Sequence, residues 1–211
     1  MKKLFAAVLF TAVLPVTALA QDAYQAGVHY QVLETPVRTA NPEKIEVNEV
    51  FAYTCVHCYR FEGVINPWKQ TLADDVDFRR TPVIWADGDP TEQLARAYYM
   101  ADVALKETEN FHKLLFRSVQ EEKKLPRKKD DVIDLFVGYG IDKAKAESAY
   151  NNFSVASQVQ LAKARAKGYK IEGTPEVIVN GKYRISTTMA GNHENVLKVA
   201  DYLIAKERAA K

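Results

Sequence analysis

Alternating apolar and polar positions predict a central strand at residues 45–53, in the sequence IEVNEVFAY. This segment alternates in its first half and ends in an apolar run, as expected for a strand that is buried on both faces. Shorter apolar runs at residues 29–33 and 77–84 predict two further strands. The chain therefore contains the strands of at least one sheet.

The apolar spacing changes to a helical period in three parts of the chain. Residues 55–72 can form one helix, and residues 91–167 carry apolar positions three and four apart over several helices, the last at 154–167. A final amphipathic helix is predicted at 194–206. Strands before and after a long helical region predict a mixed α/β fold.

A β-hairpin is predicted near the carboxyl end. Two apolar runs, at 177–179 and 183–185, are joined through Asn180 and Gly181. Asn-Gly is the pair preferred in type I′ turns, which match the twist of the flanking strands. Thr174 and Pro175 come directly before this hairpin.

The first 20 residues have the composition of a secretory signal peptide. Lys2 and Lys3 precede an apolar stretch at 4–14, and small residues at 18–20 suggest cleavage after Ala20. The alternative is a retained anchor, but the stretch falls short of a membrane span. We expect an exported protein, in a bacterium a periplasmic one.

Charge gives no indication of nucleic-acid binding. Removal of the signal peptide takes Lys2 and Lys3 with it, so the 29 basic residues fall to 27 and equal the 27 acidic ones. A nucleic-acid-binding domain would have a net basic surface.

The only two cysteines, Cys55 and Cys58, stand three residues apart between the central strand and the first helix. This C-x-x-C pattern is typical of a thioredoxin-like redox site. Free N–H groups and the positive end of the helix dipole favour a thiolate there, and Thr54 is the expected N-cap. A purely structural disulfide is the alternative, although such a short loop constrains the unfolded chain little.

Glu49 lies inside the apolar run, six residues before Cys55. Burial of a carboxylate is costly, so we expect its pKa to be raised. It is either a buried acid that manages protons during thiol exchange or an edge residue that reaches solvent.

Residues 49–62 and 173–183, EVFAYTCVHCYRFE and GTPEVIVNGKY, together resemble the DsbA family of periplasmic thiol:disulfide oxidoreductases. The resemblance implies a thioredoxin fold with an inserted helical domain. Its domains would be a signal peptide at 1–20, a thioredoxin-like domain at 21–88 and 156–211, and a helical insertion at 89–155. It implies no cofactor and no metal, and we expect a monomer.

The resemblance also implies roles for individual residues. Cys55 corresponds to the nucleophilic cysteine, Cys58 to its buried partner and His57 to a histidine that stabilises the thiolate. Glu49 corresponds to a buried acid near the disulfide. Thr174 and Pro175 correspond to a substrate-binding segment with a cis-proline that faces the active site.

The sequence departs from the family at Val56, where many members have proline. This difference affects the stiffness and pKa balance of the loop, so the redox potential does not follow from the resemblance.

The expected activity is donation of the disulfide between Cys55 and Cys58 to unfolded exported proteins with free thiols. The resemblance further implies reoxidation by a DsbB-type membrane protein. Two alternatives stay open: a disulfide reductase or isomerase, which would need a less acidic Cys55, and a non-enzymatic thiol-binding, metal-binding or chaperone-like module. Two cysteines cannot supply the paired C-x-x-C of a structural zinc site.

Overall fold

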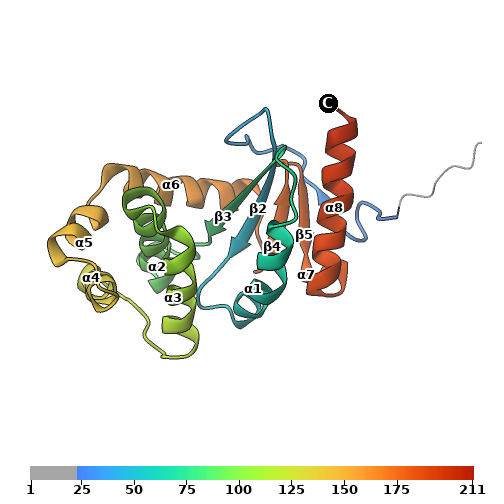
Figure 1. Ribbon diagram of the computed structural model, residues 1–211. Helices are drawn as coiled ribbons and strands as arrows, with labels where there is room; N and C mark the ends of the chain where they lie inside the picture. The colour runs from blue at the N-terminus through green and yellow to red at the C-terminus, as the bar shows by residue number, and fades with distance from the viewer. Residues whose placement is uncertain (1–22) are drawn as a thin grey trace, which may run out of the picture.

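The computed structural model describes residues 23–211, and a five-stranded mixed sheet lies at its centre. The strand order is β1-β5-β4-β2-β3 (Figure 1). Only β2 and β3 pair in parallel, and the other neighbours are antiparallel. The strands are β1 Gln31–Val32, β2 Ile45–Phe51, β3 Val76–Pro82, β4 Glu176–Val179 and β5 Tyr183–Ser186.

Strand β2 is the predicted central strand, and all seven of its residues are buried. Its neighbours are β3 on one side and β4 on the other. Glu49 is in register with Arg80 of the edge strand β3, so two charged residues meet between adjacent strands of the sheet. Because β2 is held on both sides, the residues that follow its carboxyl end have a fixed starting point.

The hairpin of β4 and β5 turns at Asn180 and Gly181, as predicted. Both residues have positive φ angles, 51° and 64°, which a type I′ turn requires. A Cβ atom on Gly181 would lie 2.0 Å from the carbonyl oxygen of Val37. Glycine is therefore needed both for the turn and for the close approach of the 37–40 segment.

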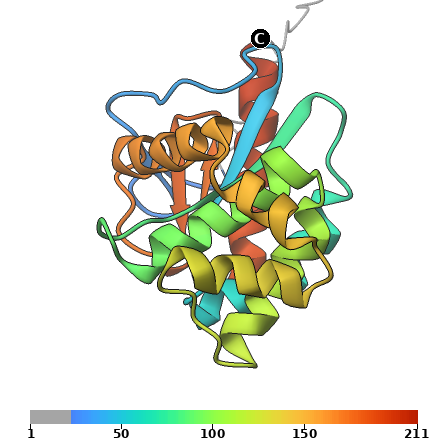
Figure 2. The same cartoon turned by 90° about the vertical axis from the view of Figure 1, so that its left-hand side faces the viewer.

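Helices cover the sheet on its two faces and extend beyond its edge (Figures 1 and 2). Helices α1 and α8 pack together on one face, where Phe61 and Ile65 of α1 join Val199 and Leu203 of α8 in one apolar cluster. The helices are α1 Val56–Lys69, α2 Pro90–Tyr99, α3 Thr108–Gln120, α4 Lys129–Gly138, α5 Lys143–Tyr150, α6 Phe153–Gly168, α7 Thr187–Ala190 and α8 His193–Ala209, with a π-helix, η1, at Met100–Leu105.

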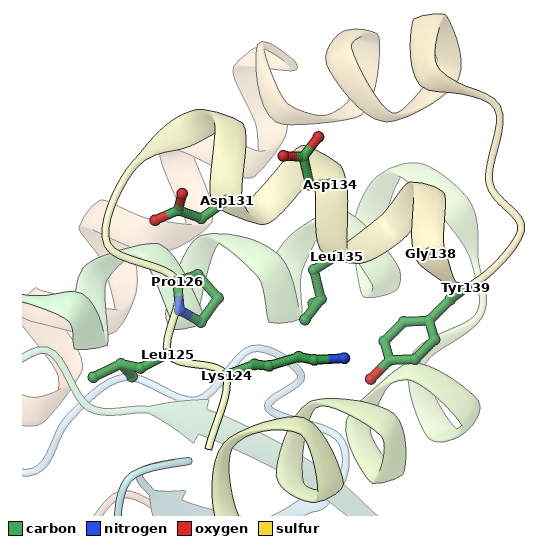
Figure 3. Close-up of a pocket in the computed structure, with 8 residues that line it drawn as sticks. All are labelled: Lys124, Leu125, Pro126, Asp131, Asp134, Leu135, Gly138 and Tyr139. Atoms are coloured by element: carbon green, nitrogen blue, oxygen red, sulfur yellow. The ribbon is translucent and has the colours of Figure 1, made fainter. Parts of the chain in front are cut away.

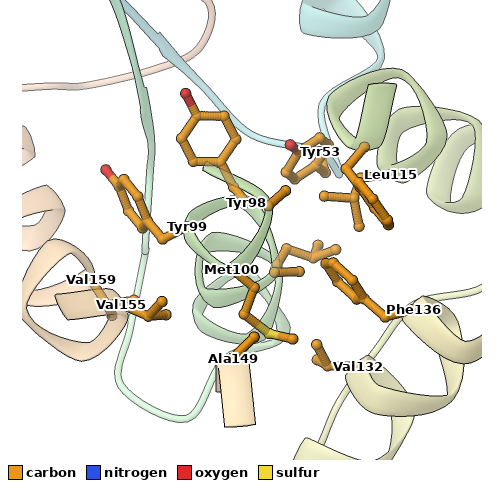
Figure 4. Close-up of a cluster of buried hydrophobic side chains, with 14 of the residues drawn as sticks. Tyr53, Tyr98, Tyr99, Met100, Leu115, Val132, Phe136, Ala149, Val155 and Val159 are labelled. Atoms are coloured by element: carbon orange, nitrogen blue, oxygen red, sulfur yellow. The ribbon is translucent and has the colours of Figure 1, made fainter. Parts of the chain in front are cut away.

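Helices α2 to α6 form a separate lobe beside the sheet, with an apolar core of its own. Met100, Leu115 and Phe136 are fully buried in this core, and Figure 4 shows them converging from different helices. Phe51 and Tyr53 enter the same cluster from the end of β2, and Cys58 enters it from α1. The lobe therefore packs directly against the segment that carries the cysteines.

Helix α6 contributes to both parts of the molecule. Val155 and Val159 near its start pack into the core of the helical lobe, whereas Ala166 and the C-cap residue Tyr169 pack against the sheet. The domain boundary predicted from the sequence after residue 155 falls in the first turn of this helix, and it stays a prediction.

Several local predictions differ from the structure. The first strand is reduced to Gln31–Val32, and His29 lies in a turn. The strand predicted at 77–84 runs from Val76 to Pro82, and the first helix ends at Lys69, two residues after Pro67. The signal peptide predicted at 1–20 lies outside the described residues. Within residues 23–211, no helix combines the length and apolarity that crossing a membrane demands.

Candidate active site

The two cysteines lie where β2 meets α1, as the sequence predicts. Cys55 itself is the N-cap of α1, with an extended backbone at φ −88° and ψ 114°. The backbone N–H of Cys58 donates a hydrogen bond to Cys55 Sγ, at 3.3 Å between N and S. The prediction that Thr54 caps the helix is wrong, because the helix starts one residue later and a sulfur atom takes the place of the hydroxyl.

The two thiols differ in exposure and in acidity. Cys55 is half-buried, whereas Cys58 has 0% of its surface exposed, and both are free thiols in this structure. A hydrogen bond from the Cys58 thiol, together with hydrogen bonds from Thr174 and from the backbone of Cys58 and His57, lowers the pKa of Cys55 to about 5 against the opposing effect of burial. Burial raises the pKa of Cys58 far above the ordinary value for a thiol. At neutral pH the outer sulfur is therefore a thiolate and the inner one a thiol.

His57 and Val56 are both exposed in the first turn of α1, and 44% of Val56 is accessible. The contribution of His57 to the acidity of Cys55 comes from its backbone N–H. Stabilisation of the thiolate by the imidazole, and an effect of Val56 on the loop, stay predictions.

The Thr174–Pro175 peptide bond is cis, as predicted, and Thr174 lies next to Cys55. Sγ of Cys55 lies 3.3 Å from the backbone oxygen of Thr174. Thr174 and Pro175 line a cavity of about 520 Å³ together with His57 and His193. An extended peptide in this cavity would lie next to Cys55.

Glu49 is fully buried, so the edge position considered from the sequence is wrong. Its Oε2 accepts a hydrogen bond from Nε of Arg80 at 2.8 Å. Burial raises the pKa of Glu49 to about 7, although the charge of Arg80 opposes this. The raised pKa of Glu49 agrees with the prediction from the sequence. The role in proton management stays a prediction, since the strongest electrostatic neighbours of Glu49 are Arg80, Glu62 and Lys69 rather than a cysteine.

Sequence reasoning missed Arg80 and gave His112 no specific function. Both are buried and bond to residues around the cysteines. The register of β2 and β3 is the signal that could have revealed Arg80, because a strand paired with a buried Glu49 calls for a compensating charge.

A second cavity, of about 540 Å³, lies in the helical lobe between α4 and the segment that precedes it. Figure 3 shows Leu125, Leu135 and Tyr139 around it, with the carboxylates of Asp131 and Asp134 at its margin. It contains no thiol, so it is not part of the redox site.

Comparisons with known proteins match most of the chain. A family model described as a DSBA-like thioredoxin domain matches residues 46–200. The chain is 39% identical to the thiol:disulfide interchange protein DsbA of Pseudomonas aeruginosa over 189 residues, which cover 90% of this chain and 88% of that protein. It is also 39% identical to the DsbA of Azotobacter vinelandii, over 88% of this chain and 85% of the relative. The crystal structure of Pseudomonas aeruginosa DsbA superposes with a TM-score of 0.83, covering 90% of this chain and 97% of that chain.

Proposed function

Because the chain belongs to the family of DSBA-like thioredoxin domains, we propose that it transfers its own disulfide to exported proteins. The chain has the thioredoxin fold with inserted helices that the sequence predicts, and it is a thiol:disulfide oxidoreductase. The proposal concerns the direction of the reaction, the residues that perform it and the partners. The acidity of Cys55 next to the buried Cys58 supports it most strongly.

The acidity of Cys55 favours an oxidant over a reductase. A thiol pKa of about 5, compared with about 8.5 for a free thiol, stabilises the reduced form at pH 7 by about 2.7 kcal/mol, or about 60 mV. A protein whose reduced form is stabilised gives up its disulfide readily.

In the first step, a thiolate of the substrate attacks Sγ of Cys55 in the Cys55–Cys58 disulfide. The bond between the two protein sulfurs breaks, and a mixed disulfide between the substrate and Cys55 forms. Cys58 leaves and takes up a proton, because its raised pKa keeps it a thiol at neutral pH. Attack at Cys55 is favoured over attack at Cys58, because Cys58 has no exposed surface.

In the second step, another thiolate of the substrate attacks the substrate sulfur of the mixed disulfide. Cys55 leaves as a thiolate, and its low pKa makes it a good leaving group. The substrate has then lost two electrons to the protein, which ends with Cys55 as a thiolate and Cys58 as a thiol. We propose that Thr174 and Pro175 hold the substrate backbone during both steps, since they line the cavity beside Cys55.

The proposed substrates are unfolded exported proteins with free thiols, and the proposed location is the periplasm. We propose a DsbB-type membrane protein as the reoxidising partner. His57 and Glu49 are proposed to tune the reaction, His57 through the Cys55 thiolate and Glu49 through proton transfer.

The test uses the purified oxidised protein and a peptide with two reduced cysteines. The wild type is expected to oxidise the peptide, and Cys55→Ser is expected to lose this activity. For Cys58→Ser, Cys55 is first converted to a mixed disulfide with thionitrobenzoate and then mixed with a peptide that has a single cysteine. The peptide thiolate should displace thionitrobenzoate, and the resulting disulfide between Cys55 and the peptide should persist because no second thiol is present to resolve it. Activity in Cys55→Ser, or the absence of any trapped species with Cys58→Ser, would overturn the proposal.

A further inference from the structure

Helix α3 of the helical lobe and its C-cap residue make three hydrogen bonds to residues 53–59, the segment that carries the cysteines. The Oη of Tyr53 lies 2.9 Å from Nδ1 of His112. Nε2 of Gln120 donates a hydrogen bond to the backbone oxygen of Tyr53 at 2.6 Å. The hydroxyl of Tyr59 donates one to Glu121, at the C-cap of α3. The lobe therefore holds residues on both sides of Cys55.

His112 is the buried member of this set, and both of its ring nitrogens have partners. Only 1% of the residue is exposed. Its Nε2 lies 3.1 Å from Oε1 of Glu62 in α1. The rings of Phe51 and Phe116 each lie 5.0 Å from the imidazole, so His112 is part of an aromatic cluster. In such a site an unpaired polar atom is costly, and two satisfied nitrogens fix the orientation of the ring.

The direction of the two hydrogen bonds follows from the charge of Glu62. Although burial opposes it, hydrogen bonding to His112 and the charge of Arg80 lower the pKa of Glu62 to about 2. Ionised Glu62 can only accept, so Nε2 of His112 carries the proton. Burial lowers the pKa of His112, which keeps the imidazole neutral at pH 7. Its Nδ1 then accepts a hydrogen bond from the hydroxyl of Tyr53.

Through these two hydrogen bonds, His112 links a residue before Cys55 to a residue after Cys58. Tyr53 precedes Cys55 by two residues, and Glu62 follows Cys58 by four in α1. The Cys55 thiolate depends on N–H groups of His57 and Cys58 in the first turn of that helix. A shift of α1 relative to the end of β2 would therefore change the acidity of Cys55.

We infer that His112 is a positioning residue through which the helical lobe sets the acidity of Cys55. The inference rests on the proposed function of Cys55 as the nucleophile. His112 touches neither sulfur; it acts by holding Tyr53 and Glu62 at a fixed separation, and with them the donors around the thiolate.

The experiment measures the pKa of Cys55 in the reduced protein from the ultraviolet absorbance of the thiolate. His112→Leu, which removes both hydrogen bonds, is expected to raise the pKa of Cys55 by about 0.5, the size of a typical helix-terminus effect. His112→Gln, which keeps one donor and one acceptor, should recover part of this change. Tyr53→Phe removes a single hydrogen bond and should have a smaller effect in the same direction.

A matched control is Phe111→Leu, one residue earlier in the same helix. The ring of Phe111 stacks on Phe136 at 4.6 Å within the helical lobe. This variant should lower the melting temperature and leave the pKa of Cys55 unchanged.

A merely structural role for His112 predicts a different result. His112→Leu would then lower the melting temperature as Phe111→Leu does, with no change in the pKa of Cys55, and this outcome would overturn the inference. If His112→Leu does not fold, Tyr53→Phe decides the question by the same measurement. The proposed function fails separately, if Cys55→Ser stays active.

Discussion

The stability of the reduced protein should depend on pH through Cys55. Its thiol has a pKa of about 5 in the folded protein and about 8.5 in an unfolded chain. Because the folded value is lower, the stabilisation is complete above pH 8.5 and is lost as the pH falls through 5. At pH 7 the two values correspond to about 2.7 kcal/mol. Since Cys55 is only half-buried, solvent screening reduces this to about 2 kcal/mol.

The assay compares melting temperatures of the reduced wild type and of Cys55→Ser between pH 4 and pH 8. Subtracting the two melting temperatures removes the contribution of the other titrating groups, including Glu49. The difference in melting temperature between wild type and variant should be about 4–8 °C larger, in favour of the wild type, at pH 7 than at pH 4. A difference that stays constant over this range would show that the fold does not stabilise the thiolate, and the redox argument would fail with it.

Three further predictions concern stability. Arg80→Gln leaves Glu49 as a buried carboxylate without its cation, so urea unfolding at pH 8 should show a free energy of unfolding lower by about 3–5 kcal/mol. A loss below about 1 kcal/mol, the size expected for an exposed ion pair, would contradict this. Because burial raises the pKa of Glu49 to about 7, the oxidised wild type should lose stability as the pH rises from about 4.3 to 7. Glu49→Gln should show a smaller slope, with the remainder due to Glu176, whose pKa burial also raises to about 7; equal slopes in the two proteins would refute the prediction. Gly181→Ala should cost more than about 1 kcal/mol, since φ is positive and the new Cβ meets Val37, whereas Gly138→Ala, with open space around it, should be tolerated.

Local sequence signals predicted the parts of the site that lie within one segment. The apolar run of β2, the C-x-x-C spacing and the Asn180-Gly181 turn each depend on a few neighbouring residues, and all three were found where expected. The cis form of the Thr174–Pro175 bond was predicted from the family resemblance alone, because no local pattern in the sequence distinguishes it from the trans form.

The parts that could not be predicted depend on how separate segments pack. Arg80 pairs with Glu49 only through the register of two strands that lie 31 positions apart in the chain. His112 has the helical periodicity of a core residue, and its bonds to Tyr53 and Glu62 exist only when the helical lobe docks on α1. The sulfur cap at Cys55 was missed because capping preferences favour hydroxyl and carboxylate oxygens.

The complete burial of Cys58 has a consequence for the kinetics of a full cycle. Only one sulfur is open to solution, so the protein that delivers electrons and the oxidant that removes them must use the same atom in turn. Turnover is then a ping-pong sequence, in which the substrate reacts with the disulfide form and the reoxidant with the thiolate form at the same sulfur atom. Because both partners react at the sulfur of Cys55, a substrate and the reoxidant cannot be bonded to it at the same time.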